Sequence, residues 1–129
     1  METTFHKNDF YINKQEKWYN NQGKLDRGDD LPAVINYYKN DGGRFSEQWF
    51  KNGVRHRDSQ LIDGKTIDLP AFIMYYKNEK KRREDWWKNG RHEKIITYNY
   101  KFSDFYVGED GRKNFVKCET EVWELAEGF

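Results

Sequence analysis

The chain has 129 residues, of which 35% are charged and 18% are aromatic, and its formal net charge is +1. This length predicts one domain, residues 1–129, with a modest core, and the near-neutral charge excludes bulk attraction to nucleic acid or acidic membranes. A single cysteine, Cys118, excludes an intramolecular disulfide. No apolar run approaches the ~18 residues of a membrane span, and the N-terminus has no apolar signal region, so we expect a cytoplasmic protein.

The first third of the chain predicts short antiparallel strands. Residues 2–13 place apolar residues on both sides of a polar segment and predict a hairpin. Residues 16–20 predict a strand, because their side chains alternate between two faces, and residues 21–23 predict a turn, because Asn and Gly adopt positive φ at low cost. Residues 24–27 predict the return strand, and residues 33–39 predict the next strand.

The middle of the chain repeats this arrangement twice. Residues 44–51 predict a strand that Asn52-Gly53 turns back on itself, since this dipeptide favours a type I′ hairpin turn. The segment 59–66 is an insertion of eight residues relative to the first unit, and we expect it to be a surface loop. The strands 71–77 and 82–88 follow, joined by a turn at 79–80, and a second Asn-Gly turn, Asn89-Gly90, ends the strand 82–88.

The C-terminal part is less regular. Residues 94–102 alternate and predict a strand, Gly108–Gly111 predicts a turn, and residues 114–118 predict another strand. The tail, 119–129, predicts either a final strand or a short helix. An atypical last unit is typical of the cap that closes a repeat protein.

Two phrases recur along the sequence. Glu47–His56 reads Glu-Gln-Trp-Phe-Lys-Asn-Gly-Val-Arg-His, and related segments lie at 16–25 and 84–92. An Asp-Leu-Pro-Ala phrase begins at Asp30 and again at Asp68. Such self-similarity indicates a repeat protein, with units at about 16–46 and 47–83, a degenerate unit at 84–93 and a C-terminal cap at 94–129. The predicted fold is all-β: antiparallel β-hairpin repeats in an extended twisted sheet, open or partly closed, with atypical terminal caps.

In these phrases the chain resembles the MORN-like hairpin repeats. The Glu-x-Trp-x-x-Asn-Gly-x-x-His segment is similar to the Glu-Trp…Gly-Lys…His core of that motif, and the Arg…Asp-x-Pro-Ala phrase is similar to a variant found in phage and giant-virus proteins and in some bacterial proteins. The resemblance implies a hairpin-repeat fold over about 16–93 and a viral or phage source. The Tyr-x-Gly-Glu opening of the motif is absent, so membrane-lipid binding is not implied.

The aromatic residues of the repeats predict two rows. Trp18, Trp49 and Trp86 share one position of the repeat and should stack along one face as a structural spine, while Tyr19, Phe50 and Trp87 should line the opposite face. A single sheet cannot bury both faces without a partner or a curl. An exposed aromatic row would be a platform for a protein or for a base.

No motif for catalysis, phosphate binding or metal binding is present. His56 and His92 fall at similar positions of two repeats, which we attribute to the recurring fold, and no His or Cys cluster has ligand spacing. Glu16, Glu47 and Glu84 recur a whole unit apart, too far to act on one substrate, and we expect cross-strand pairs with Lys or Arg. The prediction is therefore no enzyme, no cofactor and no metal.

The features that break the repeat's regularity are the best candidates for a binding surface, because stacking does not require them. These are the insertion with its neighbouring rings and the basic run: Phe50, Trp87, Ser59, Leu61, Asp63, Lys65, Lys80, Lys81, Arg82 and Arg83. We expect a non-catalytic protein that binds another protein. The alternative is a nucleotide or nucleic-acid binder that counteracts host defence from the host cytoplasm, and homo-oligomerisation stays open.

Overall fold

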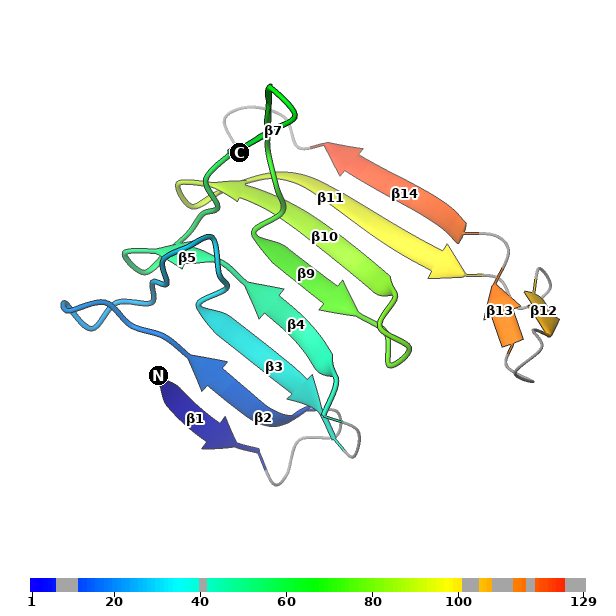
Figure 1. Cartoon of the computed structure of the whole chain (residues 1–129), viewed down its shortest axis with the longest axis horizontal. Coiled ribbons are helices and arrows are strands. Elements are labelled where there is room, and N and C mark those ends of the chain that lie inside the picture. The colour runs from blue at the N-terminus through cyan, green and yellow to red at the C-terminus, as the bar shows by residue number, and fades with distance from the viewer. Residues whose placement is uncertain (7–11, 40–41, 101–104, 108–112, 116–117, 125–129) are drawn as a thin grey trace.

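The computed structural model describes residues 1–6, 12–39, 42–100, 105–107, 113–115 and 118–124. These residues form no helix, and therefore none long and apolar enough to cross a membrane. Eight strands lie side by side in one open antiparallel sheet, in the order β1-β2-β3-β4-β9-β10-β11-β14 (Figure 1). The all-β prediction is confirmed.

The strands of the main sheet are β1 (Glu2–Phe5), β2 (Ile12–Lys17), β3 (Val34–Tyr38), β4 (Arg44–Gln48), β9 (Phe72–Tyr75), β10 (Lys81–Lys88), β11 (Arg91–Tyr100) and β14 (Cys118–Glu124). Three further pairs form two-stranded sheets: β5 (Phe50–Lys51) with β6 (Val54–Arg55), β7 (Gln60–Ile62) with β8 (Lys65–Ile67), and β12 (Phe105–Val107) with β13 (Lys113–Phe115). The β5 and β7 hairpins lie at the same end of the main strands (Figure 1).

Several expectations for individual elements need correction. The predicted strand 16–20 ends at Lys17 as part of β2, which pairs with β1, and only a single bridge between Tyr19 and Leu25 remains of the first repeat hairpin. The insertion 59–66 is not a loop, because most of it forms the β7–β8 hairpin. The tail is a strand, β14, as far as Glu124. The predicted turn Gly108–Gly111 lies outside the described residues.

The chain leaves the main sheet at the first two repeat tryptophans, Trp18 and Trp49, whereas β10 continues through Trp86 to Lys88. β4 ends at Gln48, the amide of Trp49 donates to the carbonyl oxygen of Ala71 at 2.8 Å, and β5 begins at the next residue. The amide of Trp18 donates in the same way to Ala33, also at 2.8 Å. The single long strand predicted for 44–51 is therefore two short ones. The hairpins that follow Trp18 and Trp49 stand beside the main sheet, whereas the third hairpin is part of it.

One row across the sheet alternates glutamate and isoleucine. The register aligns Glu16 with Ile35, Ile35 with Glu47, Glu47 with Ile73, Ile73 with Glu84 and Glu84 with Ile96. Ile35 and Ile73 are buried core residues, Ile96 is half-buried, and Glu47 and Glu84 are only 7% and 5% exposed. A buried carboxylate is costly unless it is paired and hydrogen-bonded, so each of these glutamates needs partners.

Tyrosines and same-strand cations supply these partners. The hydroxyl of Tyr75 donates to Glu47, and the hydroxyl of Tyr98 donates to Glu84. Arg44 reaches Glu47 at 2.6 Å and Lys81 reaches Glu84 at 3.3 Å, each from three residues earlier in the chain. The expected cross-strand ion pairs are therefore replaced by ion pairs within one strand and by cross-strand tyrosine hydroxyls. Burial, followed by the neighbouring Glu47 carboxylate, raises the pKa of Tyr75 well above its ordinary value.

The two Asn-Gly turns have the predicted conformation. Asn52 and Gly53 have φ of 50° and 77°, and Asn89 and Gly90 have φ of 49° and 79°. Positive φ at both central residues is the mark of a type I′ turn, whose twist matches that of the flanking strands. Each turn also packs on the hairpin before it.

We predict that Gly53→Val destabilises the protein by more than about 1 kcal/mol, because a β-branched residue is strained at this φ. The measurement is the free energy of unfolding in urea. Gly28→Val is the matched control, since its Cβ would meet no atom within 4 Å and its φ is not positive. Equal stability of the two variants would contradict the assignment of a strained turn.

Candidate functional site

Each repeat tryptophan lies under a cation rather than on another tryptophan. The guanidinium carbon of Arg27 is 3.7 Å from the ring centroid of Trp18, that of Arg57 is 4.0 Å from Trp49, and the Lys94 ammonium is 4.2 Å from Trp86. Among the described residues the three indoles make no ring contact with one another. The prediction of a directly stacked row is wrong, because a cation from the same hairpin covers each ring.

A joint between the first two repeats forms around Arg57. Its guanidinium makes two 2.9 Å hydrogen bonds to the carboxylate of Asp30 and a third, also 2.9 Å, to the carbonyl oxygen of Pro70. The Trp49 indole N–H donates to the carbonyl oxygen of Asp30 at 3.0 Å. The Trp49 ring and its covering arginine therefore hold the Asp-Leu-Pro-Ala loop of the preceding unit.

The next repeat keeps the indole contact but divides the role of Arg57 between Lys94, which covers Trp86, and Lys88, which pairs with Asp68. The Trp86 indole N–H donates to the carbonyl oxygen of Asp68 at 3.1 Å, and the Asp68 side chain lies 3.3 Å from the ammonium of Lys88. A hydrogen bond from Ser59, followed by one from Lys88, lowers the pKa of Asp68. The recurring Asp-Leu-Pro-Ala phrase is thus the part of each loop that the following tryptophan fixes.

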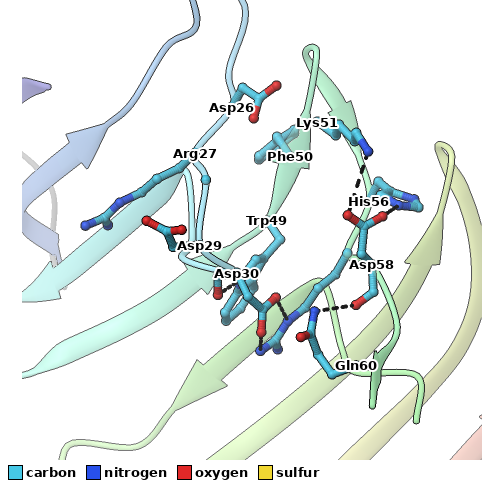
Figure 2. A pocket seen from close by; sticks show the side chains of 12 residues that line it. Asp26, Arg27, Asp29, Asp30, Trp49, Phe50, Lys51, His56, Asp58 and Gln60 are labelled. Atoms are coloured by element: carbon cyan, nitrogen blue, oxygen red, sulfur yellow. Dashed lines mark hydrogen bonds and ion pairs between the residues drawn. The ribbon is translucent and has the colours of Figure 1, made fainter. Parts of the chain in front are cut away.

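A polar hollow of about 200 Å³ opens beside this joint, between the 26–30 loop and the 56–60 segment (Figure 2). Its lining residues are Asp26, Arg27, Gly28, Asp29, Asp30, Trp49, Phe50, Lys51, His56, Arg57, Asp58 and Gln60. Acidic and basic side chains alternate around it and largely pair with one another, as the dashed contacts of Asp30 and Asp58 in Figure 2 show. This pairing leaves the hollow with no single sign of charge to attract an ion.

His56 connects this hollow to the third hairpin. Its Nδ1 accepts a hydrogen bond from the amide of Asn89 at 2.9 Å, so the neutral ring carries its proton on Nε2, which lies 2.6 Å from Asp58. This hydrogen bond from His56 is the main reason that the pKa of Asp58 is lowered. His56 is therefore fully used in joining two hairpins.

The hairpin registers show that His56 and His92 are not equivalent. Phe50 pairs with Arg55 and Trp87 pairs with His92, so His92 corresponds to Arg55 and Glu93 corresponds to His56. The third hairpin is one residue shorter between its turn and its histidine, which hides the shift in the sequence. His92 stacks on Trp87 with centroids 4.3 Å apart, and its Nε2 lies 2.9 Å from the buried Asp85.

The second aromatic row is partly buried around one arginine. The Arg55 guanidinium lies 5.6 Å from the Phe50 ring and 5.4 Å from the Trp87 ring, and it also donates to the side-chain oxygen of Gln48 at 2.8 Å. Trp87 packs against the core formed by Trp49, Ala71 and Ile73. Phe50 and Trp87 are thus half-buried, with an arginine between them.

The insertion residues lie on the β7–β8 hairpin, at the end of the sheet where β5 lies (Figure 1). Ser59 is held at its base by Asp68 and by the Lys88 ammonium at 3.0 Å. Leu61 is 75% exposed, and Asp63 and Lys65 lie at the exposed turn. The structure therefore brings four of the predicted site residues together on one projecting element.

The basic run does not form one patch. Lys81 pairs with Glu84, and the Arg83 guanidinium makes 2.7 and 2.9 Å hydrogen bonds to Asp85. Arg82 lies 5.6 Å from the Tyr76 ring, and the amide of Lys80 bonds to the side chain of Asn78. The run opens strand β10, at the end of the sheet away from the β7–β8 hairpin (Figure 1).

We predict that Trp49→Ala lowers the free energy of unfolding by about 3–5 kcal/mol, because the change removes a buried ring. The indole hydrogen bond to Asp30 and the surface that covers Arg57 are lost with it. The measurement is chemical denaturation, with Lys65→Ala as the surface control. A comparable loss in both variants would contradict the role given to Trp49.

We predict that Asp30→Asn costs about 1–3 kcal/mol, because it leaves the Arg57 guanidinium, 12% exposed, without its carboxylate. Asp29→Asn is the matched control, since Asp29 is exposed and has nearly the same φ, 60° against 55°. Denaturation of the two variants should separate them clearly. Indistinguishable stabilities would mean that the Arg57–Asp30 pair does not join the repeats.

No outside relative assigns a role to this geometry. Among the residues that the structure describes, no three His, Cys, Asp or Glu side chains converge as metal ligands. Comparison with protein-family models, with curated proteins and with solved structures finds no match to this chain. The argument for function therefore rests on the surfaces described above.

Proposed function

We propose that this chain is a non-catalytic binding protein that engages another protein through the β7–β8 hairpin. The observation that carries the proposal is the set of aliphatic side chains that this hairpin exposes: Leu61 is 75%, Ile62 is 42% and Ile67 is 38% exposed. Register places Ile62 and Ile67 on one face of the hairpin and Leu61 on the other. Both faces thus present apolar surface.

The hairpin is not explained by the needs of the fold. Among the described strands, β7 and β8 pair only with each other, and the first repeat joins the equivalent positions with eight residues fewer. An isolated two-stranded hairpin is marginally stable in water, and clustered exposed aliphatic groups are typical of interaction sites. A protein partner that covers this hairpin would bury the aliphatic surface that the chain leaves in water.

The base of the hairpin is fixed, which favours binding. The Lys88 ammonium donates to the carbonyl oxygen of Arg57 at 2.7 Å and to Ser59 at 3.0 Å, and Ser59 in turn donates to Asp68. These contacts close the two ends of the insertion. A preorganised element loses less conformational entropy when it binds than a loop that must first become ordered.

The nucleic-acid alternative is less well supported. Within the basic run, Lys81 already pairs with Glu84 and Arg83 already pairs with Asp85. The MORN-like assignment and the cytoplasmic location belong to the same proposal, and the type I′ Asn-Gly hairpins support the first of them. Protein binding accounts for more of the surface than phosphate binding does.

The test begins with capture of partners from lysate, with mass spectrometry of proteins and small molecules, and continues with the purified partner. We expect the double variant Leu61→Ser/Ile67→Ser to weaken binding at least tenfold, about 1.4 kcal/mol. Phe5→Ser, an exposed apolar residue on strand β1, is the control and should leave affinity unchanged.

Unchanged affinity of a folded double variant would rule the hairpin out. Salt separates the two partner classes, because phosphate contacts make affinity fall steeply with salt concentration. A steep fall, together with capture of a nucleotide or nucleic acid, would overturn protein binding in favour of the alternative.

A further inference from the structure

The repeat hairpins stack through a recurring pair of hydrogen bonds. The amides of Asn52 and Gly53 donate to the Asp26 carboxylate at 3.0 Å and to the Leu25 carbonyl oxygen at 2.8 Å. In the next step, the amides of Asn89 and Gly90 donate to Nδ1 of His56 at 2.9 Å and to the carbonyl oxygen of Arg55 at 2.8 Å. Each type I′ turn thus presents two N–H groups to two acceptors on the preceding hairpin.

The stack begins at the first hairpin, whose turn has no preceding repeat hairpin to bond to. Its turn donors are used internally: the Asn20 side-chain oxygen accepts from the amides of Gln22 at 3.0 Å and Lys24 at 3.1 Å. The amide of Gly23 donates to the carbonyl oxygen of Asn20 at 3.0 Å. The turn of the first hairpin therefore has no equivalent donor pair to offer.

Among the residues that the structure describes, none covers the other end of this stack, at the third hairpin. By register His92 corresponds to Arg55, and Glu93 corresponds to His56. The pair Trp87–His92 is the non-hydrogen-bonded pair of a two-residue hairpin, so the carbonyl oxygen of His92 points away from β10. Within the described ranges no donor reaches this carbonyl oxygen or the Glu93 carboxylate. The described part of the chain therefore leaves the two acceptors of the next step unused.

The β7–β8 hairpin carries an unused donor pair of matching shape. Asp63 and Gly64 have φ of 51° and 76°, the conformation of the two stacked Asn-Gly turns. A Cβ added at Gly64 would meet no atom within 4 Å, whereas one added at Gly90 would lie 3.1 Å from Val54 of the hairpin beneath it. In the described part of the chain, the amides of Asp63 and Gly64 donate to nothing.

The charges around the two surfaces are complementary. Asp63 and Lys65 flank the unstacked turn, and Arg91 and Glu93 flank the open acceptors. Among the residues that the structure describes, none of these four side chains has an ion-pair partner. Lys24, Val54 and Arg91 are equivalent positions of the three hairpins, and in the two stacked steps Lys24 and Val54 lie beside the turn of the next hairpin. Gly64 would then lie beside Arg91, and Asp63 is its neighbour in the chain.

We propose that the β7–β8 hairpin of one copy docks on the open side of the third hairpin of a second copy of this chain. The amides of Asp63 and Gly64 would donate to the Glu93 carboxylate and the His92 carbonyl oxygen, and Leu61, Ile62 and Ile67 would be partly covered. The inference rests on the proposed binding role of this hairpin and specifies a second copy as a partner.

Sedimentation velocity of the full chain, from low micromolar to submillimolar concentration, tests the inference. The wild-type chain should associate with rising concentration. Asp63→Lys and Arg91→Glu should each weaken self-association at least tenfold, while an equimolar mixture of the two variants should recover it, because the reversed charges attract each other. Glu79→Lys, an equal charge change at an exposed turn between β9 and β10, should have no effect.

A wild-type chain that stays monomeric at every concentration would overturn the inference, as would variants that fail to recover association when mixed. The same variants distinguish a failure of the docking between copies from a failure of the proposed function. If self-association is absent but Leu61→Ser/Ile67→Ser still weakens binding to the purified partner, the hairpin binds a different protein only. If self-association is present and that double variant binds the partner normally, the proposed partner site is wrong and the docking stands.

Discussion

The contact between an indole face and the cation that covers it is the interaction on which this structure most depends. Arg57 lies on Trp49 and bonds both to Asp30 of the preceding loop and to Pro70 of the following one. A cation over an aromatic ring contributes roughly 0.5–2 kcal/mol, depending on its desolvation. Because Arg57 meets three segments at once, it fixes the path of both loops, the placement of the hairpin and the position of the polar hollow.

In the described part of the chain no second layer of strands or helices covers the main sheet, and its buried polar side chains form hydrogen bonds with one another. Asn36 receives a hydrogen bond from Gln15 and donates one to Ser46, both at 2.9 Å, so three neighbouring strands share one polar chain. On the other face, tyrosine hydroxyls reach the buried glutamates. These side chains shield the backbone of a thin sheet from water without the large apolar core that its composition could not supply.

Features with a local physical cause were predictable from the sequence. The Asn52-Gly53 and Asn89-Gly90 turns follow from the φ preferences of two residues. Asp63-Gly64 carries the same preference, and reading it would have turned the expected insertion loop into a hairpin. The Ile-x-Tyr pattern of Ile35–Tyr37 and Ile73–Tyr75 also recurs at Ile96–Tyr98. This third copy is easily overlooked because no Asp-Leu-Pro-Ala phrase precedes it.

Features that depend on which elements meet in space were not predictable. The covering of each tryptophan by a cation depends on which residue of the return strand lies opposite the ring, as Lys94 lies opposite Trp86. The mismatch of His56 and His92 also appears only when the hairpin register is known. Likewise, nothing in the spacing of Lys80 to Arg83 shows which carboxylates they meet.

The joint at Arg57 also shapes how such a chain can change length. Its partners come from its own unit or from the units directly before and after it, so the contacts of one joint do not depend on units further away. Stability in such arrays is close to a sum over units and neighbouring interfaces. Duplication of one unit would reproduce contacts that already exist and would create no new kind of interface. Gain or loss of a whole unit would therefore leave the contacts of the remaining joints in place.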